Sequence, residues 1–219
     1  MSPTVLLDGP RAAAAAGGPP RQLVILLHGY GADGHDLFGL APELARVLPH
    51  AAFVSPNAPE PCAAAGFGYQ WFPIGGLDRQ AMLAGVTAAA PTLAAFIDAE
   101  RDRLGLKDEN IALLGFSQGT MMALYVGLRR VAPCAAIVGF SGTLVGGETI
   151  DCDRKHPPVL LVHGSSDPLV PVLALHEAVR DLKAARIAVE WEVRPGLPHA
   201  IDPEGLRRAA AFLKTHLPS

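Results

Sequence analysis

The pentapeptide Gly115-Phe116-Ser117-Gln118-Gly119 decides the fold of this chain, because it joins an apolar, strand-like run (110–114) to a helix-like segment (118–130). We interpret it as a nucleophile elbow, a sharp strand-to-helix turn that lifts a serine hydroxyl above a sheet. The two flanking glycines remove side chains that would collide in such a turn. Because the string G-x-S-x-G also arises by chance, its meaning depends on the rest of the chain.

Strand-like and helix-like segments alternate on both sides of the elbow. The apolar run Leu23–Leu27 is typical of a strand buried on both faces. Further strands are predicted at 51–54, 110–114, 135–140, 159–162 and 187–193, and helices at 36–48, 79–103, 118–130, 170–183 and 203–216. Pro91 is expected to kink or split the second helix. Repeated strand–helix units predict an α/β fold, with helices on both faces of a mostly parallel sheet, in a single domain over residues 1–219.

Two segments do not follow this alternation. Residues 1–22 contain a predicted edge strand, Thr4–Leu7, and a Gly/Pro/Ala connector that is expected to be exposed. Residues 55–77 are rich in proline and glycine and are too irregular for a helix or a strand. Long loops in compact domains are often functional. We therefore predict that this loop forms a wall of a substrate site through its aromatic side chains, Phe67, Tyr69, Trp71 and Phe72.

Composition excludes several classes of function. Half of the 219 residues are apolar, 18% are charged and the net charge is −3, so no basic patch for nucleic acid or an anionic membrane is indicated. No stretch reaches the roughly 18 apolar residues of a membrane-spanning helix, and no integral membrane segment is expected. The first residues do not resemble a secretory signal, which favours the cytoplasm. Three cysteines fit no zinc or disulfide framework, and Cys134 is predicted to be an inert core residue.

Three polar residues in loops after predicted strands can supply the chemistry of an activated serine. A serine hydroxyl needs a base to accept its proton, and that base needs a carboxylate to fix its tautomer. Ser117, Asp167 and His199 occur in this order, which is the order of the α/β-hydrolase fold. Since loops after parallel strands meet at one edge of the sheet, we expect these three side chains to form a catalytic triad.

Alternatives exist for the base and for the carboxylate. His28 and His163 also end strands and could approach the site, but each precedes a glycine in a turn. Asp202 follows His199 by three residues and is more consistent with a cap of the last helix. Asp167 itself precedes a proline, where aspartate is also a common turn residue.

An acyl-transfer site also needs donors for a developing oxyanion. In this fold one donor is the backbone N–H of the residue after the nucleophile, here Gln118, and the other comes from the turn after an early strand. Tyr30, which lies in the Gly-rich turn after Leu27, is the residue predicted for the second donor. Its side chain is also a predicted substrate contact at the entrance.

Five segments together resemble the phospholipase/carboxylesterase family of small serine hydrolases, from Leu23 to near the end of the chain. They are Leu27–Asp33, Ser55–Pro59, Gly115–Gly119, His163–Pro171 and Pro198–His199. The resemblance implies a cytosolic α/β-hydrolase that cleaves acyl esters or thioesters through an acyl-enzyme, without a cofactor or metal. It places the catalytic roles on Ser117, Asp167 and His199, and the oxyanion roles on the backbones of Tyr30 and Gln118.

The predicted function is a carboxylesterase for short to medium acyl chains, acting on a small-molecule ester or thioester as a monomer or homodimer. Acyl-protein thioesterase or lysophospholipase specificity is an alternative within catalysis. A hydrolase fold that binds a ligand or a partner without turnover is an alternative of another class. The sequence does not specify the natural substrate or the acyl length.

Overall fold

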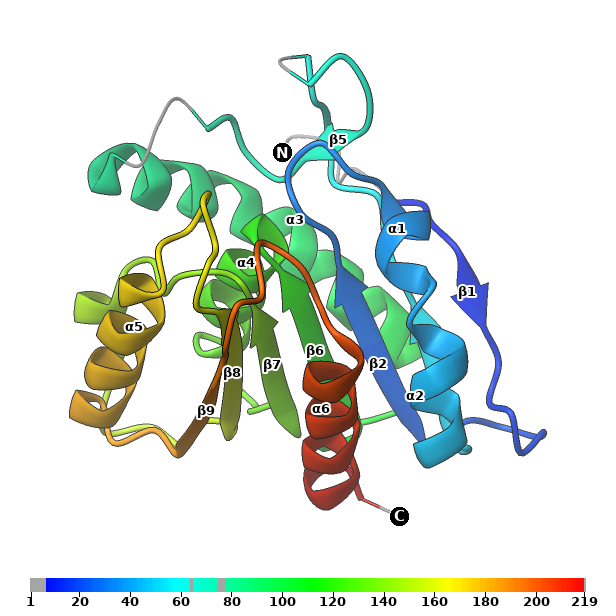
Figure 1. The fold of residues 1–219 in the computed structure, drawn as a ribbon. Helices are drawn as coiled ribbons and strands as arrows, with labels where there is room; N and C mark the ends of the chain where they lie inside the picture. The colour runs from blue at the N-terminus through cyan, green and yellow to red at the C-terminus, as the bar shows by residue number, and fades with distance from the viewer. Residues whose placement is uncertain (1–6, 64, 75–77, 219) are drawn as a thin grey trace.

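A seven-stranded sheet organises the protein, as seen in the computed structural model, which describes residues 7–63, 65–74 and 78–218 (Figure 1). The strand order is β1-β3-β2-β6-β7-β8-β9, and every neighbouring pair is parallel except β1 with β3. The strands are β1 (Arg11–Ala12), β2 (Gln22–Leu27), β3 (Ala51–Val54), β6 (Ile111–Phe116), β7 (Ala136–Phe140), β8 (Val159–Gly164) and β9 (Val189–Arg194). This is the predicted α/β fold with a mostly parallel sheet.

Helices cover both faces of the sheet. They are α1 (Gly34–Phe38), α2 (Ala41–Val47), α3 (Arg79–Leu104), α4 (Gln118–Gly127), α5 (Leu173–Ala184) and α6 (Pro203–His216). Helices α1, α2 and α6 lie on the face towards the viewer in Figure 1, and α3 and α4 lie behind the sheet. Strand β2 serves both cores, because Leu23 and Ile25 pack towards α3 and α4 while Val24 and Leu26 pack towards α2 and α6. The uninterrupted apolar run of β2 is explained by this burial on both faces.

The structure corrects two predictions about the elements, and a third falls almost wholly outside the described residues. The predicted helix 36–48 is two helices, because Pro42 lacks an N–H and is placed in the first turn of α2. Pro91 does not split α3, which is continuous over 26 residues. The predicted edge strand Thr4–Leu7 lies outside the described residues except for Leu7, which is in no strand; the edge strand is β1, within the predicted connector.

The loop 55–77 contains a small two-stranded sheet of β4 (Glu60–Pro61) and β5 (Tyr69–Gln70). It lies above the carboxyl ends of the large sheet in Figure 1, next to the turn after β2. The contact is made by backbone hydrogen bonds, from Gly31 N–H to Tyr69 O at 2.9 Å and from Tyr69 N–H to Ala32 O at 2.7 Å. The loop is therefore attached to the turn that carries Tyr30.

Helix α3 is long and apolar enough to cross a membrane by length and composition alone. Its most apolar 18-residue window has a mean hydropathy of 1.5, and 28% of that window is buried. Core helices of soluble proteins show the same property. The absence of an integral membrane segment therefore stays a prediction.

Candidate active site

Ser117 lies at the junction of β6 and α4 in a backbone conformation that only a tightly held turn maintains. Its φ is 53° and its ψ is −115°, and its N–H donates a hydrogen bond of 2.9 Å to the carbonyl of Phe140 at the end of β7. A non-glycine residue with this φ is strained by about 1–3 kcal/mol, and such strain is concentrated at functional sites. The strained turn is the geometry that the pentapeptide predicts.

The two glycines of the elbow are required by close backbone approaches. A Cβ on Gly119 would lie 1.8 Å from the carbonyl oxygen of Leu27, at the end of β2. A Cβ on Gly115 would lie 2.4 Å from the backbone of Gly119. Any side chain at either position would push α4 away from the sheet, which confirms the role predicted for both glycines.

Asp167 and His199 are brought together from loops 32 positions apart in the chain. The Nδ1 atom of His199 lies 2.7 Å from Oδ2 of Asp167. The other carboxylate oxygen, Oδ1, accepts the backbone N–H groups of Leu169 and Val170, each at 2.9 Å. Both oxygens of this buried carboxylate are therefore oriented, with Oδ2 directed at the imidazole.

The charge of Asp167 is maintained in spite of burial. Burial by itself opposes ionisation of the carboxyl. The hydrogen bonds from Val170, His199 and Leu169 outweigh that effect, so the pKa of Asp167 lies below its ordinary value. Asp167 is thus a carboxylate at neutral pH, as a group that orients an imidazolium must be.

The imidazole of His199 lies against the elbow. Its ring centroid is 4.8 Å from that of Phe116, the residue before Ser117, with the two rings inclined at 51°. Because Nδ1 is engaged by Asp167, Nε2 is the nitrogen available for proton transfer with a serine hydroxyl. The structure thus places Asp167 against His199, and His199 against the residue that precedes Ser117. The catalytic roles of the three residues stay a prediction.

His163 also contacts Asp167, which the sequence analysis missed. Its ring is buried, and Nε2 lies 2.8 Å from the carbonyl oxygen of Val170 and 3.4 Å from Oδ2 of Asp167. Since a carbonyl only accepts, Nε2 carries the proton and is shared between these two oxygens. The signal in the sequence was the spacing of four residues between His163 and Asp167, which only a folded turn converts into a contact.

His28 supports the turn that carries the predicted oxyanion donor. Its buried ring accepts the N–H of Ala58 at Nε2, at 2.9 Å, so Nδ1 carries the proton and donates to the carbonyl of Gly29 at 2.7 Å. In the described residues we find no hydrogen bond from the backbone N–H of Tyr30 or of Gln118. Both groups are therefore available as donors, and His28 is not a competing base because both of its ring nitrogens are engaged.

The side chain of Gln118 holds the loop 55–77 over the elbow. Its Oε1 accepts the N–H of Trp71 at 2.9 Å, and its Nε2 donates to the carbonyl of Phe72 at 2.7 Å. The indole N–H of Trp71 donates in turn to the carbonyl of His28 at 3.0 Å. The loop is thus connected to the elbow through Gln118 and to the turn after β2 through the Trp71 indole.

This arrangement changes the interpretation of the aromatic residues in the loop. Trp71 and Phe72 were predicted to contact substrate, but their exposed fractions are 1% and 2%, and they pack in the core with α3 and α4. Their role is packing in the core, and almost none of their surface is accessible to a ligand. Tyr69 is half-buried in β5, and Phe67 is 75% exposed; for these two residues and for the side chain of Tyr30, a substrate contact stays a prediction.

Comparison with known proteins agrees with this geometry. The family model described as Phospholipase/Carboxylesterase matches residues 11–217. The chain belongs to the phospholipase/carboxylesterase family. An acyl-protein thioesterase 1 from Gibberella zeae is 31% identical over 89% of this chain and 90% of its own. A probable carboxylesterase from Oryza sativa is 32% identical over 97% of this chain and 83% of its own.

The solved structure of esterase PE8 superimposes on this protein with a TM-score of 0.92 and 42% sequence identity. The superposition covers 97% of this chain and 100% of the PE8 chain. With the family match, this likeness shows that the protein is a hydrolase with the α/β-hydrolase fold. It is a serine hydrolase of the esterase class, as predicted. A thioesterase is equally compatible with the relatives.

Within the described residues, no group of three His, Cys, Asp or Glu side chains of this esterase is arranged to hold a metal ion. Cys134 is buried, and burial raises the pKa of its thiol to about 12, which confirms the prediction of an inert core cysteine.

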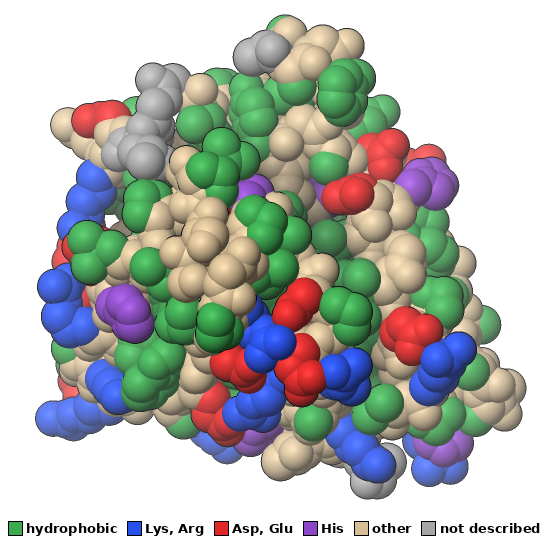
Figure 2. Space-filling view, viewed as in Figure 1, with side chains coloured by type: hydrophobic (Ala, Val, Ile, Leu, Met, Phe, Trp, Pro, Cys, Tyr) green, Lys and Arg blue, Asp and Glu red, His purple; other side chains and the backbone are tan. Residues whose placement is uncertain are grey.

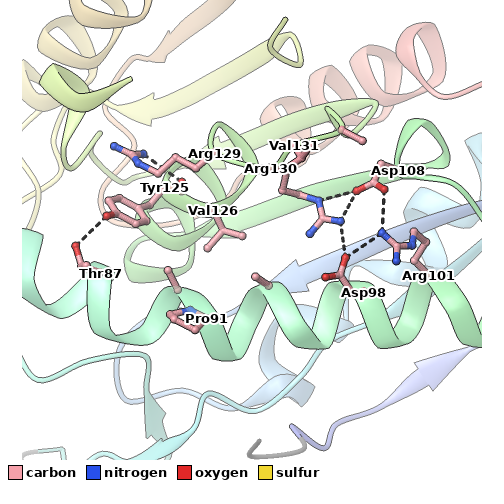
Figure 3. A pocket seen from close by; sticks show the side chains of 13 residues that line it. Thr87, Pro91, Asp98, Arg101, Asp108, Tyr125, Val126, Arg129, Arg130 and Val131 are labelled. Carbon is pink, nitrogen blue, oxygen red and sulfur yellow. Dashed lines mark hydrogen bonds and ion pairs between the residues drawn. The ribbon is translucent and has the colours of Figure 1, made fainter. Parts of the chain in front are cut away.

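A hollow of about 530 Å³ lies between α3 and the end of α4, away from the elbow (Figure 3). Its charged residues pair with one another: Arg130 contacts Asp98 and Asp108, and Arg101 contacts the same two carboxylates at 3.0 Å. The guanidinium of Arg129 lies 3.9 Å from the centre of the Tyr125 ring. The contact of Arg130 with Asp98 joins the segment after α4 to α3, and we assign this hollow a structural role in the esterase.

Stability of the esterase is expected to fall between pH 7 and pH 5 because His28 and His163 are buried. Burial lowers the pKa of both histidines. For His28, the Gly29 carbonyl and the nearby carboxylates of Asp33 and Asp36 raise the pKa in part. For His163, the Val170 carbonyl and Asp167 raise the pKa in part, and His199 lowers it further. The unfolded chain binds protons at these histidines below about pH 6.5, and the folded chain binds them only at lower pH. Stability contributed by their neutral forms is therefore present above that pH and is lost below it, by up to about 1.4 kcal/mol per pH unit for each histidine.

Urea unfolding at pH 5, 6 and 7 measures this slope. The His163→Gln variant, which retains a donor for the Val170 carbonyl, should show about half the slope of the unmodified protein. Asp167 does not interfere, because its lowered pKa confines its titration to the region below about pH 4. A free energy of unfolding that stayed constant from pH 7 to pH 5 would contradict the prediction.

Proposed function

We propose that the protein hydrolyses carboxylic esters of short to medium acyl chains through an acyl-enzyme on Ser117. The single observation that carries the assignment of residues is the 2.7 Å contact between Asp167 and His199, at an imidazole that packs beside the strained elbow. A serine on an elbow, an oriented imidazole and free N–H donors form the set that acyl transfer requires.

The reaction proceeds in two halves. His199 Nε2 accepts the proton of the Ser117 hydroxyl as the oxygen attacks the acyl carbonyl, and the backbone N–H groups of Tyr30 and Gln118 bind the resulting oxyanion. Collapse breaks the bond to the alcohol, which leaves with the proton from His199. Water then attacks the acyl-enzyme with the same proton transfers, and the products are one carboxylic acid and one alcohol. The elements of water are consumed, and no cofactor takes part.

A thioesterase is the second candidate, since one relative is an acyl-protein thioesterase and the attacking groups would be the same. A panel of oxygen esters and thioesters with matched acyl groups separates the two. The cytoplasmic location and the monomeric or homodimeric state stay predictions.

Labelling with a fluorophosphonate tests catalysis independently of substrate. We expect the pure protein to form a covalent adduct at Ser117 and to lose its esterase activity in proportion to labelling. A short-chain ethyl ester present in excess should slow the labelling. Absence of an adduct at Ser117 would favour a ligand-binding protein without turnover.

A further inference from the structure

Two neighbouring hollows lie next to Phe116, the residue that packs against His199, and together they are called the groove. The smaller, of about 230 Å³, is lined by Asp36, Leu37, Leu40, Phe116 and Ile201. The larger, of about 800 Å³, lies between α2 and α6. Leu40 and Ile201 line both, so the two hollows meet there. Phe116 connects the groove to the site, because its ring packs against that of His199.

The lining of the larger hollow is mainly apolar. From α6 and the residues before it come Ile201, Pro203, Leu206, Ala210 and Ala211, and Leu40 and Val47 face them from α2 and the residue before it. In Figure 2, which views this side of the molecule, hydrophobic side chains lie between charged ones over these two helices. The groove therefore offers apolar surface along most of one helix.

Four of the five charged residues that line the larger hollow have partners, and among the described residues Lys214 is in no ion pair. Arg46 pairs with Glu43 at 2.9 Å, Asp202 with Arg194 at 2.9 Å, and Arg207 with Glu204. Because the charges in these exposed ion pairs are already balanced, a ligand does not need to be charged to bind beside them. The groove thus suits an uncharged, extended, apolar group.

The chemistry of the site decides which part of the substrate lies there. The departing oxygen receives its proton from Nε2 of His199, because Nδ1 is held by Asp167. The leaving group must therefore start beside the His199 imidazole. Phe116 contacts that imidazole and lines the mouth of the groove, so the groove continues from the position of the leaving group.

We propose that the groove between α2 and α6 binds the alcohol portion of the ester, and that the substrates are esters of unbranched aliphatic alcohols. This inference rests on the proposed function and adds the class of leaving group. Burial of each methylene contributes up to about 0.8 kcal/mol, which corresponds to about a fourfold gain in kcat/KM where burial is complete.

A series of acetate esters from ethyl to decyl tests the proposal. With the acyl group constant, kcat/KM should rise about two- to fourfold per methylene until the alcohol fills the groove. A second series, with ethanol constant and the acyl chain extended, measures the acyl side separately. A length dependence in the acyl series together with none in the alcohol series would overturn the inference, and failure to hydrolyse any ester would instead overturn the proposed function.

Ala211→Trp makes the test specific to this groove. Ala211 is exposed, so the indole fills the groove without removing a buried group, and it lies about 12 Å along α6 from Pro203 at 1.5 Å per residue. Relative to its rate on ethyl acetate, the variant should lose about tenfold or more in kcat/KM on decyl acetate. Ala211→Asp should give the same selective loss through its charge.

Ala132→Trp is the matched control. Ala132 is also an exposed alanine that lines a hollow, but that hollow is the one between α3 and α4. We expect its profile across both ester series to match that of the unmodified protein. Equal effects of Ala211→Trp on short and long alcohols, or the same profile change in Ala132→Trp, would contradict the proposal.

Discussion

The Ser117→Ala variant is expected to lose about 10⁵- to 10⁶-fold in kcat for ester hydrolysis, the scale found when a serine hydrolase loses its nucleophile. Without the hydroxyl no acyl-enzyme forms, while the N–H groups of Tyr30 and Gln118 can still bind an oxyanion. A residual rate above that in water is therefore expected. Substrate affinity should change little, because alanine removes a single oxygen.

Ser141→Ala is a suitable control for this variant. Ser141 is also a buried serine with a positive φ, of 48°, and it follows β7 close to the elbow. Its hydroxyl has no hydrogen-bond partner among the described residues, so its removal should leave kcat within about twofold. Normal hydrolysis by pure Ser117→Ala protein would refute the assignment of the nucleophile.

The Asp167→Asn variant is expected to lower kcat by about 10⁴-fold with an intact fold. The N–H groups of Leu169 and Val170 would hold the amide oxygen of the asparagine where Oδ1 now lies. Its NH₂ group would then face Nδ1 of His199 and donate to it. The ring proton would be forced onto Nε2, and His199 could not accept the proton of Ser117.

Asp202→Asn distinguishes this effect from a general loss of charge near His199. Asp202 caps α6 by accepting the N–H of Gly205 at 2.8 Å and pairs with Arg194, and asparagine keeps the capping oxygen. We expect activity within about threefold of the unmodified protein. Steady-state kinetics of both variants, with urea unfolding to verify stability, makes the comparison. A larger loss in Asp202→Asn than in Asp167→Asn would reassign the orienting carboxylate.

The choice between these two carboxylates could not be predicted from sequence patterns alone. Asp202 is three residues from His199 and Asp167 is 32 residues away, yet the imidazole bonds to Asp167. The order Ser, Asp, His favours Asp167 only if the fold is already assumed. His199 comes close to Asp167 because β8 and β9 are parallel neighbours, so that the loops that follow them lie at the same edge of the sheet.

The loop 55–77 is a second feature that sequence patterns predicted only in part. Its aromatic residues marked it as important, but composition could not separate the buried Trp71 and Phe72 from the exposed Phe67. The separation comes from the side chain of Gln118, which bonds to the backbone at residues 71 and 72 from a position 46 to 47 residues away in the chain. Long-range bonds of this kind leave no local pattern.

The sequence alone specified the elbow, the buried strands on either side of it and the order of the polar residues after the strands. These features depend on interactions between residues that are neighbours in the chain. Glycine spacing, apolar runs and strand-to-helix turns depend on sterics and burial within a few residues, so they can be read directly from the chain. The tertiary structure decided the partner of His199, the contact of His163 with Asp167, the burial of Trp71 and the groove between α2 and α6. Each of these depends on distances between segments far apart in the chain, which are fixed only when the two hydrophobic cores pack against the sheet.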